Sequence, residues 1–81
     1  MRLRSIQVRC HAGSKADESP RRLRVNERWL DVLEVTDRWY EKGTDPEWPP
    51  ADYFKVLAGD IHSYLIKHDL ECDEWFLVRR W

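Results

Sequence analysis

The cysteines and histidines are the first candidates for chemistry, because a thiol beside an imidazole can ionise and act as a nucleophile. Cys10 and His11 are adjacent in the chain. Ile6, Val8 and Cys10 alternate with polar residues, which predicts a strand whose neighbouring side chains point to opposite faces. A catalytic dyad is therefore not expected, and we interpret Cys10 as a small buried apolar residue.

A metal site is the second candidate, since His62, His68 and Cys72, with Cys10 and His11 as further members, belong to residue types that bind zinc. In one strand the two histidines would lie about 20 Å apart, at about 3.3 Å per residue, which is beyond the reach of a single ion. His68 and Cys72 flank a predicted turn, but the closely spaced ligand pairs of zinc sites are missing. The sequence predicts neither a bound metal nor a cofactor.

The carboxylates of Asp69, Glu71, Asp73 and Glu74 crowd another part of the chain. Paired carboxylates catalyse when burial separates their pKa values, whereas a turn as polar as this one is solvated. We interpret these acids as a solubilising turn, with a weak divalent-ion site as the alternative. Because glycine-rich phosphate loops and a Ser-His-Asp order are also absent, we do not expect an enzyme.

The charge of the chain is unevenly distributed, although its net value is only −1. Residues 1–28 carry eight basic against three acidic side chains, residues 29–74 carry four against twelve, and residues 75–81 add two arginines. If the first and last strands lie side by side, the two basic ends can merge into one surface. The alternative is that these arginines pair with acids on neighbouring strands.

Arginines neutralise phosphates and aromatic rings stack on bases, so a basic surface of this kind is a candidate nucleic-acid or partner interface. Leu23 and Val25 are expected to face the core, which leaves Arg22 and Arg24 in one solvent-facing row. An isoelectric point near 6.3 argues against a dedicated nucleic-acid binder. The candidate contact residues are Arg9, Arg22, Arg24, Arg28, Trp48, Arg79 and Arg80.

The elements that must position these residues are mostly strands. Asn26 and Glu27 separate two apolar-alternating segments and predict a tight turn. Between residues 28 and 41 apolar residues occupy both parities, which predicts a bulge or bend between Asp31 and Glu34; a helix is the competing interpretation. Residues 12–20 and 42–52 are rich in turn formers and predict loops. Most of the five tryptophans are expected to be packing residues.

Gly59 and Asp60 predict a two-residue type II′ turn that joins the segments 53–58 and 61–68 in an antiparallel hairpin. A helix through the same region is periodic too, but it would place Gly59 in its interior at a cost of about 1 kcal/mol. Residues 69–73 predict a further turn before a last strand. The expected fold is therefore one all-β domain over residues 1–81, a small antiparallel meander or partly open barrel of five to six strands.

The chain from about Arg21 onward resembles a family of small uncharacterised bacterial β-domains, through DRWYE at residues 37–41, YFKV at residues 53–56 and HDLECDEWFL at residues 68–77. Domains of that family occur alone or as the C-terminal tail of proteins related to Y-family DNA polymerases. The resemblance implies an all-β fold and a DNA-repair setting. This sequence departs from the family pattern at the Asn26-Glu27 turn, where glycine is usual.

These observations lead to two functional hypotheses. The first is a non-catalytic interaction module that binds another protein through a barrel surface or an edge strand. The second is a barrel that binds single-stranded nucleic acid with its basic N- and C-terminal strands. The N-terminus has no apolar run suited to a signal peptide or a membrane span, so a cytoplasmic location without membrane contact is expected.

Overall fold

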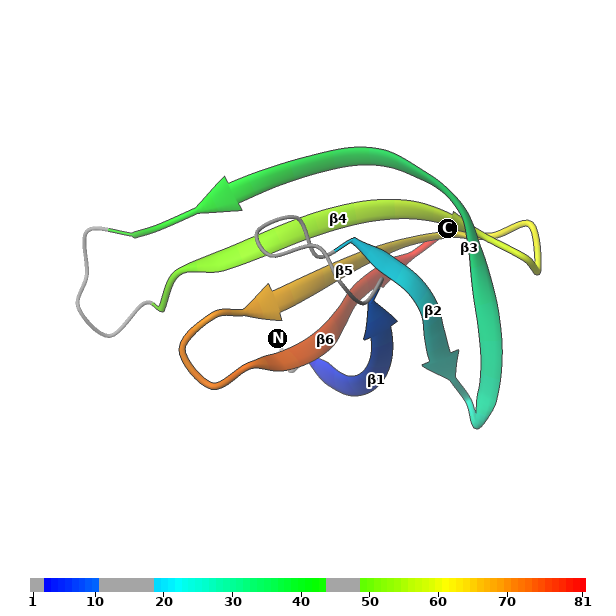
Figure 1. The fold of residues 1–81 in the computed structure, drawn as a ribbon, viewed down its shortest axis with the longest axis horizontal. Coiled ribbons are helices and arrows are strands. Elements are labelled where there is room, and N and C mark those ends of the chain that lie inside the picture. The colour runs from blue at the N-terminus through cyan, green and yellow to red at the C-terminus, as the bar shows by residue number, and fades with distance from the viewer. Residues whose placement is uncertain (1–2, 11–18, 44–48) are drawn as a thin grey trace.

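The structure is a computed structural model that describes residues 3–10, 19–43 and 49–81. In these residues all regular structure is β, which confirms the expected fold class and excludes both helical alternatives. Each strand pairs antiparallel with the next, and β1 pairs with β6 to close a barrel (Figure 1). The strands are β1 (Arg4–Cys10), β2 (Pro20–Val25), β3 (Arg28–Glu41), β4 (Ala51–Ala58), β5 (Ser63–Asp69) and β6 (Glu74–Arg80).

The core forms because alternate side chains of β2, β4 and β5 point into the barrel. Leu23 and Val25 are buried as expected, while Arg22, which points to the opposite face of β2, is exposed. In β5, and in β4 from Tyr53 to Ala58, half-buried and buried residues alternate, as a sheet with one face on a core requires. The buried cluster consists of Leu23, Val25, Leu30, Phe54, Val56, Ala58, Tyr64, Ile66 and Trp75.

Strand β3 is long because it belongs to two pairings. Its first residues pair with β2 up to Asp31, and from Val32 onward it pairs with β4. The β3–β4 register shifts between Val32 and Glu34, which confirms the predicted bend, and shifts again between Val35 and Asp37. Bulges bend a strand and increase its twist, and β3 accordingly curves around the barrel before it extends along β4 (Figure 1).

Two of the turns were predicted to contain two residues, and the structure confirms one of these predictions. Asn26 and Glu27 form the predicted tight turn, with φ of 51° and 64°, as a type I′ turn requires. The type II′ turn at Gly59 is wrong. The left-handed residue is Ile61 (φ 67°), whose amide donates to the Ala58 carbonyl at 2.9 Å.

The longer β4–β5 turn has a physical cause in Asp60. Its carboxylate accepts the His62 amide at 3.1 Å and the Tyr64 hydroxyl, which holds three residues between Ala58 and His62. The Ala58 amide then donates to the His62 carbonyl at 3.0 Å. Ile61 and His62 therefore lie in the turn rather than in the expected strand.

Replacing Ile61 with glycine is expected to stabilise the protein by about 0.5–1 kcal/mol. Left-handed backbone costs a non-glycine residue about 1–2 kcal/mol, and the greater freedom of unfolded glycine offsets part of the gain. Ile61 is 74% exposed, so little packing is lost. Urea denaturation measures the change. The control Leu70→Gly changes an exposed turn residue without positive φ and should destabilise; equal effects would contradict the prediction.

The expected loops are slightly shorter than predicted at their ends. β2 begins at Pro20 and β4 at Ala51, so residue 20 and residues 51–52 belong to the sheet. The turn between β5 and β6 lies where it was predicted, at residues 70–73. The part of the chain that the structure describes has no helix long and apolar enough to cross a bilayer.

Candidate functional site

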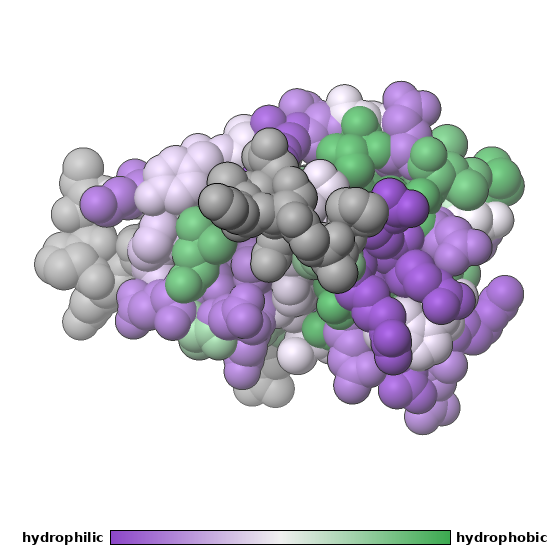
Figure 2. Space-filling model, viewed as in Figure 1, coloured by the Kyte–Doolittle hydropathy of each residue, from purple (hydrophilic) through white to green (hydrophobic). Residues whose placement is uncertain are grey.

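Three of the arginines that were predicted to contact a partner or a nucleic acid share the outer face of β1, β2 and β3. Because Leu23 and Val25 point inward, the register places Arg9, Arg22 and Asp31 in one outward row. Gln7, Arg24 and Trp29 form the next row. We call the surface formed by Gln7, Arg9, Arg22, Arg24 and Trp29 the basic face. Figure 2 shows strongly hydrophilic side chains over β2.

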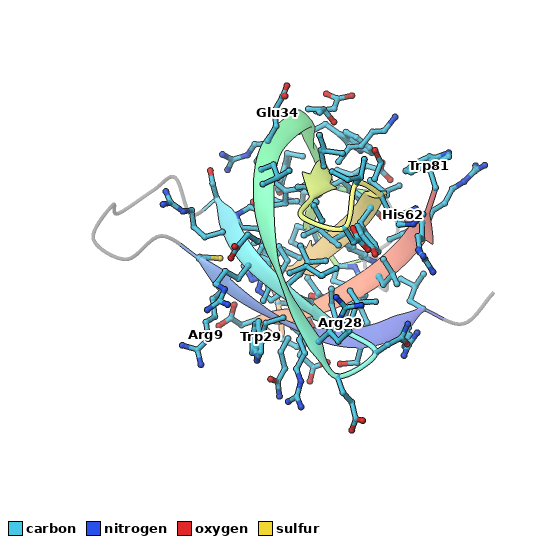
Figure 3. All side chains as sticks on the ribbon, turned by 90° about the vertical axis from the view of Figure 1, so that its right-hand side faces the viewer. Arg9, Arg28, Trp29, Glu34, His62 and Trp81 are labelled. Carbon is cyan, nitrogen blue, oxygen red and sulfur yellow. The ribbon has the colours of Figure 1, made fainter. Side chains whose placement is uncertain are left out.

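Trp29 is the centre of the basic face. The Cζ atom of Arg9 lies 5.0 Å from the centroid of the Trp29 ring, and that of Arg22 lies 6.0 Å from it. Figure 3 shows Arg9 and Trp29 next to each other. Arg22 also forms an ion pair with Asp31 at 3.1 Å. Arginines thus cover the indole and hold it in place through cation–π contacts.

Arg24 is the least satisfied member of this face. Its Nε atom is buried and has no hydrogen-bond partner among the described residues. Beside it, Arg4 donates to the Asn26 Oδ1 atom at 2.6 Å. Arg4, Arg24, Asn26 and Glu27 line a hollow of about 360 Å³ with Gln7. A second hollow of about 410 Å³, lined by Arg9 and Trp29 on one side and by Asp73 and Glu74 of the β5–β6 region, shares the β1 residues Ser5, Ile6 and Gln7.

The C-terminal arginines are not part of the basic face. β1 and β6 do pair, as expected, with Arg4 opposite Leu77. Because the pairing is antiparallel, Arg9 lies at the end of β1 that is farthest from Arg79. Arg79 and Lys55 instead flank the ring of Trp81, at 4.8 and 4.5 Å, on the other side of the molecule in Figure 3.

The remaining candidate contact residues lie away from both the basic face and the Trp81 ring. Arg28 and Arg80 line a pocket of about 100 Å³ at one end of the barrel, together with Asp60 and Tyr64. Arg28 from the first basic segment and Arg80 from the last thus come together, but the candidate arginines as a whole divide into three groups instead of one patch. Trp48, another predicted contact residue, lies outside the described residues.

A second surface, the outer edge of β3, was not foreseen in detail. Leu33, Val35, Trp39 and Tyr40 are 58%, 36%, 36% and 57% exposed, although apolar residues in a strand are usually read as core. In Figure 2, green and pale side chains occur along the margin where β3 runs in Figure 1. In the sequence, the apolar residues change parity after Asp31. This change indicates that some of them cannot face the core.

Trp39 is fixed on this surface by two contacts. Its ring stacks on that of Tyr53, with centroids 5.3 Å apart and planes 4° from parallel. Its indole N–H donates to Glu41 at 3.3 Å. The register places Asp37 opposite Lys55 and Trp39 opposite Tyr53, so Asp37, Trp39 and Glu41 alternate along the outward face. Burial, followed by the negative charge of Glu41, raises the pKa of Tyr53.

The two histidines of the described residues, His62 and His68, are engaged in structural contacts. A ring nitrogen of His62 lies 2.8 Å from the Trp81 carbonyl. His68 is buried, stacks on Trp75 with centroids 4.1 Å apart, and lies 2.6 Å from Asp73. In residues 3–10, 19–43 and 49–81 no three metal-ligating side chains come together.

Cys72 is the exposed cysteine of the described structure, whereas the Cys10–His11 dyad considered above includes a residue outside it. Partial desolvation and the nearby negative charge of Asp69 raise the pKa of the Cys72 thiol, which reduces its thiolate fraction. Asp69 also accepts the Glu71 and Cys72 amides, at 2.9 and 3.3 Å, and so shapes the turn before β6. His11, the other member of the dyad, lies outside the described residues.

No protein-family model matches this chain, and no curated protein and no solved structure is significantly similar to it. The expected relationship to the bacterial β-domains stays a prediction. The functional proposals below therefore depend on the two surfaces just described.

Proposed function

We propose that this protein is a non-catalytic interaction module that binds an extended segment of another protein along the outer edge of β3. The exposure of this strand carries the proposal: four of the seven large apolar side chains that are exposed in the described structure lie on β3. Among the described residues, no strand pairs with residues 32–41 on the side away from β4. Free edges of this kind accept an added strand through backbone hydrogen bonds.

The two bulges limit where a partner strand can pair. Register shifts interrupt the ladder at Val32–Glu34 and at Val35–Asp37, and bulged backbone pairs poorly with a straight strand. Residues 37–41 pair regularly with β4 and offer the longest uninterrupted edge. We therefore place the partner segment beside these five residues.

The charges on this edge specify the partner. Asp37 and Glu41 flank Trp39 on the outward face, so a segment with basic, apolar and basic residues at alternate positions matches them across the new pairing. A second copy of the chain fits poorly. Antiparallel pairing about Trp39 would place Asp37 opposite Glu41, and pairing about Arg38 would place two arginines opposite each other, which is destabilising.

A short capped peptide with lysine, tyrosine and lysine at alternate positions, and valine or threonine between them, tests the proposal. It should bind the protein, and hydrogen exchange should slow at the amides of residues 37–41. The same peptide with glutamates for lysines should bind about tenfold more weakly, because each opposite-charge pair contributes about 0.2–1 kcal/mol and each like-charge pair costs a similar amount. Calorimetry measures both affinities.

Charge-neutral variants make the test specific. The double variant Asp37→Asn, Glu41→Gln should bind both peptides with similar affinity. The matched control Glu71→Gln, Glu74→Gln removes two exposed acids at the far turn and should keep the preference for lysine. Equal binding of both peptides by the native protein, or protection of amides away from β3, would contradict the proposal.

A further inference from the structure

We infer a second binding function, carried by a surface that the β3 proposal does not use: the basic face binds the phosphate backbone of a single-stranded nucleic acid. The described residues 3–10 and 19–31 contain six arginines against only Glu27 and Asp31. Their charge is locally strong although that of the whole chain is not. A local field of this kind concentrates anions.

The cross-strand pairing of Arg9 with Arg22 concentrates positive charge on this face. The two residues lie directly opposite each other on β1 and β2, an arrangement that destabilises a sheet unless an anion compensates it. Asp31 compensates Arg22. Within the described residues, no carboxylate forms an ion pair with Arg9, whose guanidinium contacts the Trp29 ring instead.

Arg24 supplies an independent observation, an unpartnered donor. Native proteins rarely leave a buried donor unsatisfied, yet the Nε atom of Arg24 has no partner among the described residues. Arg24 lines the 360 Å³ hollow together with Arg4 and one acid, Glu27. Guanidinium groups bind phosphate oxygens through two N–H donors at once, so a phosphate placed in this hollow is attracted by two arginines against a single carboxylate.

The shape of the face favours a single strand. Arg22 and Arg24 are two residues apart on β2, so they lie about 6.6 Å apart along the strand, close to the spacing of successive phosphates in an extended chain. The two adjoining hollows are lined by Ser5 and Gln7, whose side chains can hydrogen-bond the edges of unpaired bases. In a duplex those edges are already paired and stacked.

Fluorescence anisotropy with a labelled oligothymidylate tests the inference. Binding should be measurable at about 50 mM salt and should weaken with salt, with each phosphate contact contributing about 0.7 to the logarithmic slope. Arg24→Gln should weaken binding about tenfold and reduce the slope by about one contact. Arg9→Gln should have a similar effect. Circular dichroism and urea denaturation identify any variant that fails to fold.

The control Arg79→Gln removes the same charge from the Trp81 cluster and should leave the affinity unchanged. Asp37→Asn with Glu41→Gln should also leave it unchanged, so this inference and the β3 proposal fail independently. Equal losses of affinity for Arg79→Gln and Arg24→Gln would show that binding depends only on the net charge of the protein, and would overturn the inference. Tighter binding of duplex, effective competition by polyglutamate, or no binding at low salt would overturn it as well.

Discussion

Replacing Phe54 with alanine is expected to lower the free energy of unfolding by about 3–5 kcal/mol, a large part of the stability of so short a chain. Phe54 is 1% exposed and packs against Trp75, with ring centroids 5.7 Å apart. Removal of a buried phenyl ring loses its transfer free energy and leaves a cavity. The total stability of a chain this short is only about 4–12 kcal/mol at typical values per residue. Urea denaturation followed by tryptophan fluorescence measures the loss.

Phe76→Ala is the matched control, because it removes the same ring from the other side of the sheet. Phe76 pairs with Lys67 on the outward face and is only half-buried. Its loss should cost less than half as much as that of Phe54, since solvent can fill the space. If the two variants were equally unstable, the assignment of inward and outward parities in β4, β5 and β6 would be wrong.

The parts of the fold that the sequence predicts are those that depend on local alternation. Leu23 and Val25 indicated their own strand and its inward face, and the mixed parities after Arg28 indicated a bend that the register of β3 confirms. Period-two alternation is a property of the strand itself. It therefore survives without knowledge of the neighbouring strands.

The candidate surfaces depend on pairing between distant segments, and they were predicted less completely. That Arg9, Arg22 and Arg24 share one face follows from their parity and from the β1–β2 hairpin. The separation of Arg79 from them depends on the offset of β1 against β6, which no local pattern encodes. Similarly, the exposure of Trp39 depends on where β2 stops pairing with β3.

The error at the β4–β5 turn has a different origin, because a side chain decided it. Glycine is the usual signal for a positive φ in a two-residue hairpin, so Gly59 was assigned that role. Asp60 instead binds the backbone of His62 and the side chain of Tyr64. These bonds hold the left-handed conformation at Ile61, and turn propensities alone do not include them.

Replacing Tyr64 with phenylalanine is accordingly expected to destabilise the protein by about 1.5–3 kcal/mol near neutral pH, the usual contribution of a hydrogen bond to a charged group. Tyr64 is 1% exposed, and its hydroxyl donates to Asp60. Burial alone would raise the pKa of Asp60, but the hydrogen bonds from Tyr64 and the His62 amide outweigh it and lower the pKa. Burial and then the bond to Asp60 raise the pKa of Tyr64.

These opposite shifts fix the pH range in which the bond stabilises the fold. Because the folded-state pKa of Asp60 is lowered, its contribution is present above the ordinary value of 3.8 and is lost as pH falls through the folded-state pKa. Because that of Tyr64 is raised, its contribution is present below 10.0 and is lost as pH rises through the folded-state value. The stability difference between the native protein and Tyr64→Phe should therefore be constant between these limits and shrink on both sides.

Urea denaturation of both proteins from neutral pH down to about pH 3 measures the acid side, where the ordinary carboxyl value lies. Tyr53→Phe is the control, because the Tyr53 ring stacks on Trp39 on the outward face. Removal of the Tyr53 hydroxyl should change the free energy of unfolding by no more than about 0.5 kcal/mol. A Tyr64→Phe difference that stayed constant below the pKa of Asp60 would show that the tyrosine does not depend on the ionised carboxylate. The three-residue turn would then need another source of stability than Asp60.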